Sequence, residues 1–238
     1  MNKIRSLKVK IYCDGASLDD LRSMAGLDYI HGFTTNPTLM RKAQVKDYCG
    51  FIKQILPIVA GKPISFEVIS DDFREMKQQA KRLSGFGSNI YVKIPVMNTR
   101  GDDSSELIAE LSKDKIKVNV TAIMTLEQIK KVANKLDSDA DIIFSIFSGR
   151  IADTGVDPVE FIKKAKILIK NKPNIKILWA SPRELLNIFQ AEQAGSDIIT
   201  LLPDFIKKMH LIDYDLHEFS LDTIKMFYKD AQDSGLKL

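Results

Sequence analysis

Short aliphatic runs alternate along the chain with longer segments in which apolar residues recur every three or four positions. The short runs are typical of buried strands, and the longer period is typical of helices that bury one face. Ser17 and Thr125 each precede a polar partner by three residues, as at helix starts, while Gly85 and Gly195 mark helix ends. The pattern predicts eight strands, at residues 8–13, 30–35, 63–69, 89–96, 117–124, 141–148, 176–181 and 197–202.

Strands that alternate with helices predict a parallel sheet. Eight such units in 238 residues predict a single domain, residues 1–238, folded as a (β/α)8 TIM barrel. A doubly wound open sheet is the alternative, but no Gly-x-Gly-x-x-Gly motif follows the first strand. Two further helices, at residues 204–213 and 219–234, follow the eighth strand. The apolar residues of the second helix could pack on their own barrel or on a neighbouring subunit.

Charge and composition exclude several function classes. The formal charge of +4 is spread along the chain, which suggests mild attraction for anions and no nucleic-acid surface. The lysine-rich residues 161–176 place most lysines opposite their aliphatic face, which predicts a solvated outer helix and neither a nucleic-acid nor a membrane surface. Without a visible secretory signal or apolar span, and with Cys13 and Cys49 unsuited to a metal or disulfide framework, we expect a cytoplasmic protein.

Lys93 stands alone in an otherwise apolar predicted strand. Lysine is rarely buried without a reason. A neutral amine is a nucleophile toward carbonyl carbon, so a buried lysine is a candidate for covalent catalysis. The alternatives are an ion pair with a carboxylate such as Glu67, or a place at the exposed end of the strand.

Polar side chains recur at the end of seven consecutive predicted strands. Active sites of barrel enzymes form at these carboxyl ends. Any one of these residues could instead form a turn or bond to the backbone. Together they predict a polar pocket at one mouth of the barrel, formed by Asp14, Asn36, Glu67, Lys93, Asn119 with Thr121, Ser145, and Ser181 with Arg183.

These residue types suit Schiff-base chemistry. A lysine that attacks a ketone forms an imine, and the protonated imine accepts electrons as the adjacent carbon–carbon bond breaks. We expect Asp14 to take the proton from the hydroxyl at that bond, and Glu67 to manage the water of imine formation through a water held by Thr121. Arg150, and Arg183 beside Ser181 at a predicted helix start, suit a phosphate, with surface ion pairing as the alternative. The side chains expected to contact sugar hydroxyls are Asn36, Asn119 and Ser145.

Several motifs resemble those of the transaldolase family, especially its small single-barrel branch, and of the closely similar fructose-6-phosphate aldolases. The resemblance covers nearly the whole chain, and the motifs occur in the family's order. They are Gly32-Phe-Thr-Thr-Asn-Pro-Thr38, Val92-Lys-Ile-Pro-Val96, Val118-Asn-Val-Thr121, Ser145-Ile-Phe-Ser-Gly-Arg-Ile151 with Asp153 and Gly155, Ala180-Ser181 with Arg183, and residues 195–200.

The resemblance implies transfer of a dihydroxyacetone unit between sugar phosphates in carbohydrate metabolism, with no metal or organic cofactor and no nucleic-acid or membrane partner. It also implies a homo-oligomer, since small members of the family often form pentamer-based decamers. It implies these roles: Lys93 forms the Schiff base, Asp14 transfers the proton, Glu67 and Thr121 handle water, Asn36 and Ser145 contact substrate, and Arg150, Ser181 and Arg183 bind phosphate.

Two positions bear on the reaction type. In the aldolase branch a glutamine takes the place of Glu67 and a tyrosine takes the place of Phe147, so this chain resembles the transaldolases. The alternatives are an aldolase that releases dihydroxyacetone, or a non-catalytic sugar-phosphate-binding or assembly protein on a barrel scaffold. Departures from the family pattern, expected around the pocket, are Trp179, Pro182 and the lengthened loop at residues 98–101.

Overall fold

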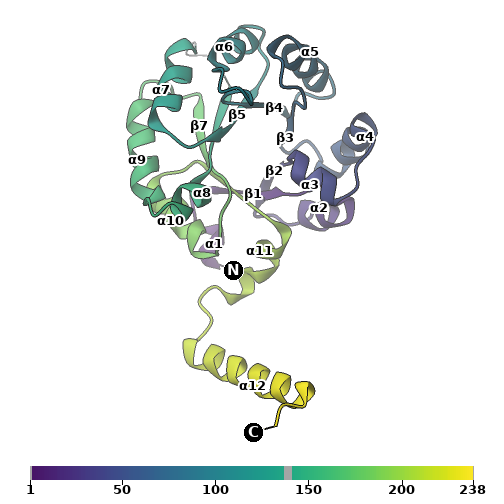
Figure 1. The fold of residues 1–238 in the computed structure, drawn as a ribbon, viewed down its shortest axis with the longest axis vertical. Coiled ribbons are helices and arrows are strands. Elements are labelled where there is room, and N and C mark those ends of the chain that lie inside the picture. The colour runs from purple at the N-terminus through teal and green to yellow at the C-terminus, as the bar shows by residue number, and fades with distance from the viewer. Residues whose placement is uncertain (1, 137–140, 238) are drawn as a thin grey trace.

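Eight parallel strands close into a barrel in sequence order (Figure 1), in a computed structural model that describes residues 2–136 and 141–237. Each strand begins and ends within two residues of its predicted bounds, and the predicted (β/α)8 barrel is confirmed. The strands are β1 (Lys10–Asp14), β2 (Ile30–Thr34), β3 (Ile64–Glu67), β4 (Ile90–Pro95), β5 (Val118–Ile123), β6 (Ile142–Ile146), β7 (Ile175–Trp179) and β8 (Ile198–Leu201).

Helices follow the strands and surround the barrel (Figure 1). Short helices α3 and α8 directly follow β2 and β6, where they help to form the mouth. The helices up to β8 are α1 (Asn2–Arg5), α2 (Leu18–Ala25), α3 (Pro37–Lys42), α4 (Tyr48–Val59), α5 (Phe73–Ser84), α6 (Ser105–Lys113), α7 (Leu126–Lys135), α8 (Ser148–Asp153), α9 (Pro158–Leu168) and α10 (Leu186–Ala194).

The predicted helix ends are only partly as expected. Thr125 forms a reciprocal capping box with Gln128, and the Ser17 side chain caps α2. Gly195 ends α10 in the left-handed conformation at φ 77°, as a glycine stop requires. Gly85 ends α5 at φ −69°, a conformation open to any residue. The predicted lysine-rich outer helix is α9, which ends at Leu168.

The strands divide the apolar side chains between two clusters. Side chains such as Phe66 and Trp179 point outward and pack against the helices in the main core. Tyr12 and Tyr91 point inward and belong to a smaller cluster inside the barrel. Gly32 makes room for that cluster, because a Cβ at this position would lie 2.5 Å from the Tyr12 ring. The inner residues fill the lower barrel and leave the carboxyl end of the strands for polar groups.

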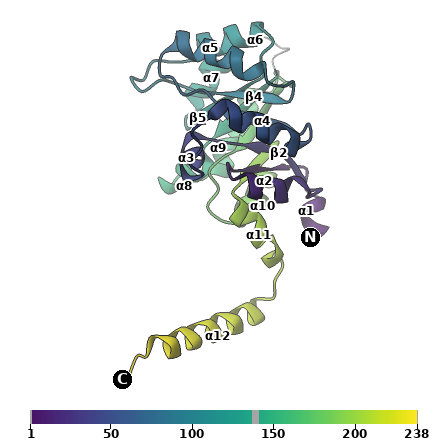
Figure 2. The same ribbon diagram turned by 90° about the vertical axis from the view of Figure 1, so that its right-hand side faces the viewer.

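The segment after β8 differs from prediction in its first part and in its packing. The predicted helix at residues 204–213 is a short helix, α11 (Pro203–Lys207), followed by a 3-10 turn, η1 (Lys208–Leu211). The last helix, α12 (Leu216–Ser234), begins at the Asp215 cap, and none of its described residues is buried. It extends away from the barrel (Figure 2), so it does not pack on its own barrel. Within the described residues, no helix is long and apolar enough to cross a membrane.

Candidate active site

A cavity of about 470 Å³ opens at the carboxyl ends of the barrel strands. Every strand-end residue predicted to form a site lines this cavity except Asn119. The geometry therefore brings together side chains that lie up to 169 positions apart in the sequence, between Asp14 and Arg183. The predicted residues that line it are Asp14, Asn36, Glu67, Lys93, Thr121, Ser145, Arg150, Ser181 and Arg183.

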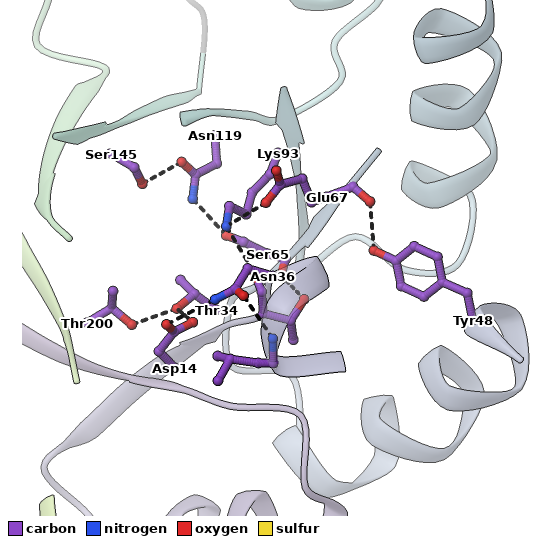
Figure 3. A network of polar contacts seen from close by, with 12 residues as sticks. Asp14, Thr34, Asn36, Tyr48, Ser65, Glu67, Lys93, Asn119, Ser145 and Thr200 are labelled. Carbon is purple, nitrogen blue, oxygen red and sulfur yellow. Dashed lines mark hydrogen bonds and ion pairs between the residues drawn. The ribbon is translucent and has the colours of Figure 1, made fainter. Parts of the chain in front are cut away.

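Lys93 lies in the middle of β4 and is only 5% exposed. Its Nζ lies 2.9 Å from Oε2 of Glu67, its register partner in β3, and donates to the backbone oxygen of Thr35 at 2.8 Å (Figure 3). The ion pair named as an alternative is thus present, but it lies at the wall of the cavity. Because a buried ion pair seldom stabilises a fold, its place beside a cavity favours a chemical role. The amine is held in one position with a proton acceptor beside it.

Glu67 and Thr121 flank this amine differently. The hydroxyl of Tyr48 donates to the backbone oxygen of Glu67 at 2.8 Å and fixes the end of β3 (Figure 3). Burial, and next the Glu67 charge, raises the pKa of Tyr48 well above its usual value, so it stays a donor.

Thr121 is 2% exposed, and its hydroxyl has no hydrogen-bond partner among residues 2–136 and 141–237. The oxygen is itself buried behind the cavity wall, so it is an unsatisfied polar group next to the site.

Asp14 ends β1 within a second set of hydrogen bonds. Its Oδ1 accepts from the Thr34 hydroxyl at 2.7 Å, and its Oδ2 accepts from the Asn36 side-chain amide at 3.3 Å (Figure 3). The Asn36 amide has a fixed orientation because its oxygen caps α3, accepting from the Leu39 N–H at 3.0 Å. Burial raises the pKa of Asp14, and Glu67 adds to this, while Lys93 and the Thr34 bond oppose it. A carboxyl with a raised pKa suits reversible proton transfer.

Asn119 lies deeper in the barrel than expected. Its amide donates to Ser65 Oγ at 3.0 Å and its oxygen accepts from Ser145 Oγ at 2.7 Å, with the side chain fully buried (Figure 3). It does not line the cavity, because it precedes Thr121 by two residues and so occupies the next layer down the same face of β5. The structure places it behind Ser145, which it orients, and leaves Ser145 at the cavity wall.

The two arginines reach the cavity from the β6 and β7 sides. Arg150 lies over the Phe147 ring, 5.2 Å from its centroid, and Arg183 forms a bidentate pair with Asp153. The ion pairing considered for the arginines therefore exists at Arg183, whose side chain remains 52% exposed. The expected helix start at Arg183 is wrong, because α10 begins at Leu186.

Helix α8, which carries Arg150, and the loop that carries Arg183 touch through their backbones. Ser181, next to β7, has φ 60°, and a Cβ at Gly149 would lie 1.6 Å from the Ser181 oxygen. Only glycine at position 149 permits this approach of α8 to the loop after β7. Through this contact Arg150, Ser181 and Arg183 all lie on one side of the cavity mouth. Several donors on one side would suit the recognition of an anion.

Several residues that line or support the cavity were not among those predicted from the sequence. Thr200 and Thr34 line the cavity, and Tyr48 and Ser65 support its polar residues from behind. Thr34 and Thr200 belong to the quoted motifs, and inward alternation along their strands would have pointed to both. Of the departures from the family pattern, Pro182 lines the cavity, whereas Trp179 points into the helix layer and does not. Among the described residues, no group of three His, Cys, Asp or Glu side chains could hold a metal ion.

Comparison with known proteins identifies the family of the chain. A family model described as Transaldolase/Fructose-6-phosphate aldolase matches residues 11–238. A probable transaldolase from Nitrosopumilus maritimus is 34% identical over 226 residues, 93% of this chain and 94% of that protein. Another from Thermoanaerobacter sp. is 33% identical over 231 residues, 97% of this chain and 100% of that protein.

Solved structures with little sequence similarity share the barrel. A mandelate oxidase with benzoyl-formic acid superposes with a TM-score of 0.55 at 12% identity, and covers 82% of this chain and 64% of that one. A mutant flavocytochrome b2 with benzoylformate gives 0.51 at 12%, covering 84% and 61%. This chain spans about three fifths of each of those longer chains, and the likeness concerns the fold alone. The family match over most of the chain shows that this protein belongs to the transaldolase/fructose-6-phosphate aldolase family.

Proposed function

We propose that this protein is a transaldolase that transfers a dihydroxyacetone unit between sugar phosphates through a Schiff base on Lys93. The observation that carries the proposal is the 2.9 Å contact between Lys93 Nζ and the Glu67 carboxylate at a cavity that Asp14 also lines. A nucleophile, a proton acceptor beside it and a second acid–base group are the parts that this chemistry needs. Fructose 6-phosphate as donor and erythrose 4-phosphate as acceptor are the sugars that the family resemblance suggests.

The first step forms the imine. The neutral amine of Lys93 attacks the C2 carbonyl of the ketose phosphate, and the resulting carbinolamine loses water. Glu67 is close enough to take a proton from the ammonium and return it to the departing hydroxyl. The Thr121 hydroxyl has no partner in the described part of the chain, and we assign it to that water once a small movement of the wall opens its buried oxygen to the cavity.

The second step breaks and remakes a carbon–carbon bond. Asp14 accepts the proton of the C4 hydroxyl, and the C3–C4 electron pair moves into the protonated imine to give an enamine. The aldose phosphate leaves with its new carbonyl. In the reverse sense, the enamine carbon attacks the acceptor aldehyde, and Asp14 returns its proton to the new hydroxyl. Water then adds to the imine and frees Lys93.

Glu67 and Phe147 favour transfer over release. Release of dihydroxyacetone requires protonation of the enamine and hydrolysis, and the tyrosine hydroxyl that serves water handling in the aldolase branch is replaced here by a phenyl ring. That ring lines the cavity and carries Arg150 on its face. An aldolase that releases dihydroxyacetone is the second candidate function.

Trapping tests the covalent step and the transfer together. Borohydride with fructose 6-phosphate should label Lys93, as found by peptide mapping, and erythrose 4-phosphate should speed consumption and yield sedoheptulose 7-phosphate. Equal rates with and without the acceptor would favour the aldolase. Absence of any labelled lysine would favour a non-catalytic binding protein.

The phosphate site has its own test. Arg183→Ala should lower kcat/KM for fructose 6-phosphate by roughly one to two orders of magnitude, because one charge-assisted bond contributes about 1.5–3 kcal/mol. The loss should be far smaller with unphosphorylated fructose, whose binding makes no such bond. Asp153→Asn is the matched variant, since it releases the Arg183 fork without removing its charge. Equal losses on both donors would assign Arg183 to the loop structure instead.

A further inference from the structure

Thr200 lies in β8, is 5% exposed and lines the cavity without touching Lys93 or Glu67 in any hydrogen bond of the described residues. Its Oγ1 lies 2.6 Å from Oγ1 of Thr34, and Thr34 in turn donates to Asp14 Oδ1 at 2.7 Å. Strand β1 lies between β2 and β8 in the barrel, so the two threonines come from the strands on either side of Asp14 and meet each other, and of the two only Thr34 bonds to Asp14 among the described residues (Figure 3).

The number of hydroxyl protons decides which residue donates in each of the two hydrogen bonds that link Thr200, Thr34 and Asp14. A threonine hydroxyl has one proton, and Thr34 uses it to donate a hydrogen bond to the Asp14 carboxylate. The 2.6 Å contact must then carry the proton of Thr200, so the order is Thr200 to Thr34 to Asp14. When Asp14 holds a proton on Oδ1, both bonds can reverse, because each hydroxyl donates or accepts by rotation.

Ionised Asp14 gains more from this chain than protonated Asp14 does. A bond to a carboxylate is stronger than a bond between neutral groups, and a donor behind Thr34 polarises the Thr34 hydroxyl further. The other oxygen of Asp14 meets the Asn36 amide, whose orientation the α3 cap fixes. The hydrogen bond from Thr34 to Oδ1 is therefore the contact through which a second residue can stabilise the ionised form of Asp14.

We propose that Thr200 is a positioning residue that holds Asp14 in its proton-accepting form by acting through Thr34. The inference rests on the proposed function, in which Asp14 takes the C4 hydroxyl proton. The charged groups acting on Asp14 are Lys93 in β4, which favours the carboxylate, and Glu67 in β3, which opposes it. The neighbouring strands β2 and β8 contribute the two hydroxyls instead.

The test separates bond cleavage from imine formation. Thr200→Val keeps the shape of the side chain and removes its proton, and Thr200→Ser restores the hydroxyl. In Thr200→Val, the acidic limb of the kcat profile with fructose 6-phosphate and erythrose 4-phosphate should move up by roughly half to one pH unit. At neutral pH kcat should fall by roughly three- to tenfold with KM little changed.

Reductive trapping of dihydroxyacetone provides the second readout, because that ketone forms the imine without any bond for Asp14 to break. Trapping by Thr200→Val should match that of the unaltered protein, and Thr200→Ser should recover both kcat and the limb. Ser112→Ala is the control. It removes another buried hydroxyl, in α6 and outside the cavity lining, and it should leave the acidic limb in place.

The outcomes distinguish the two proposals. An unshifted limb in Thr200→Val, or equal losses of trapping and turnover, would overturn the role of Thr200 while leaving the Schiff base intact. If the unaltered protein forms no borohydride-trapped adduct, the proposed function fails, and the role of Thr200 fails with it.

Discussion

Among the described residues, two lysine–carboxylate pairs join neighbouring strands or the residues just before them, one at each end of the barrel. At the carboxyl end Lys93 and Glu67 lie 2.9 Å apart with side chains 7% and 17% exposed. At the amino end Lys117 and Asp141, which precede β5 and β6, lie 3.5 Å apart with both side chains 40% exposed. The residue types match, but the surroundings differ.

The Lys117–Asp141 pair at the amino end also interacts with neighbouring side chains. Asp141 also accepts from the Tyr91 hydroxyl at 2.7 Å, and Lys117 lies over the Tyr91 ring. Burial, with a smaller effect of Asp141, raises the pKa of Tyr12, which belongs to the same inner cluster as Tyr91, to about 12. The Lys93–Glu67 pair at the carboxyl end instead lines the cavity. Burial beside open space, and not the pairing itself, is what distinguishes Lys93 as the candidate nucleophile.

The largest expected difference between the two ends is in turnover. Lys93→Met should lower kcat by roughly 10⁴-fold or more and abolish adduct formation, because it removes the nucleophile. Lys117→Met should keep both within a few-fold, and should lower the free energy of unfolding by about 1 kcal/mol or less, as is typical of exposed pairs. Steady-state rates, borohydride labelling and denaturant titration measure these effects. A full loss of labelling in Lys117→Met, with the fold intact, would remove the distinction.

The carboxylates should differ by a smaller factor. Glu67→Gln keeps the side-chain shape but cannot take a proton from Lys93, so the rate of imine formation should fall by roughly 10²–10³-fold. Asp141→Asn should leave that rate unchanged. Stopped-flow formation of the adduct with fructose 6-phosphate gives the comparison. A change of less than tenfold in Glu67→Gln would assign proton transfer to another group.

The smallest expected effect is on stability, and it has opposite signs at the two ends. The pKa of Asp14 is raised in the folded state, so its ionisation costs stability above that pKa and costs nothing below the unfolded value of about 3.9. Asp14→Asn should therefore raise Tm at neutral pH, with a gain that fades as the pH falls through the raised pKa. Asp141→Asn should lower Tm at neutral pH, since it weakens the pair with Lys117. Thermal melts from pH 4 to 8 would show both trends, and a pH-independent gain in Asp14→Asn would contradict ionisation of the buried carboxyl as the cause.

Sequence alone determined the architecture and most of the cavity wall. The alternation of short aliphatic runs with longer segments of helical period is local, so eight strands, their order and the helices between them could be predicted from neighbouring residues. The rule that barrel sites form at the carboxyl ends then placed Lys93 and Asp14 at one mouth. Helix ends and the segment after β8 were predicted less well, because short polar stretches adopt several turn conformations of similar energy.

Only the tertiary structure decided how deep a side chain lies in the barrel, which way it points and which distant residue it contacts. Asn119 lies behind Ser145, Trp179 points outward, and α12 leaves its own barrel, none of which follows from the local pattern. Thr200 meets Thr34 across 166 residues of chain. Such contacts depend on strand register and on how the closed barrel staggers its strands, which are set by the packing of the whole molecule and not by any one segment.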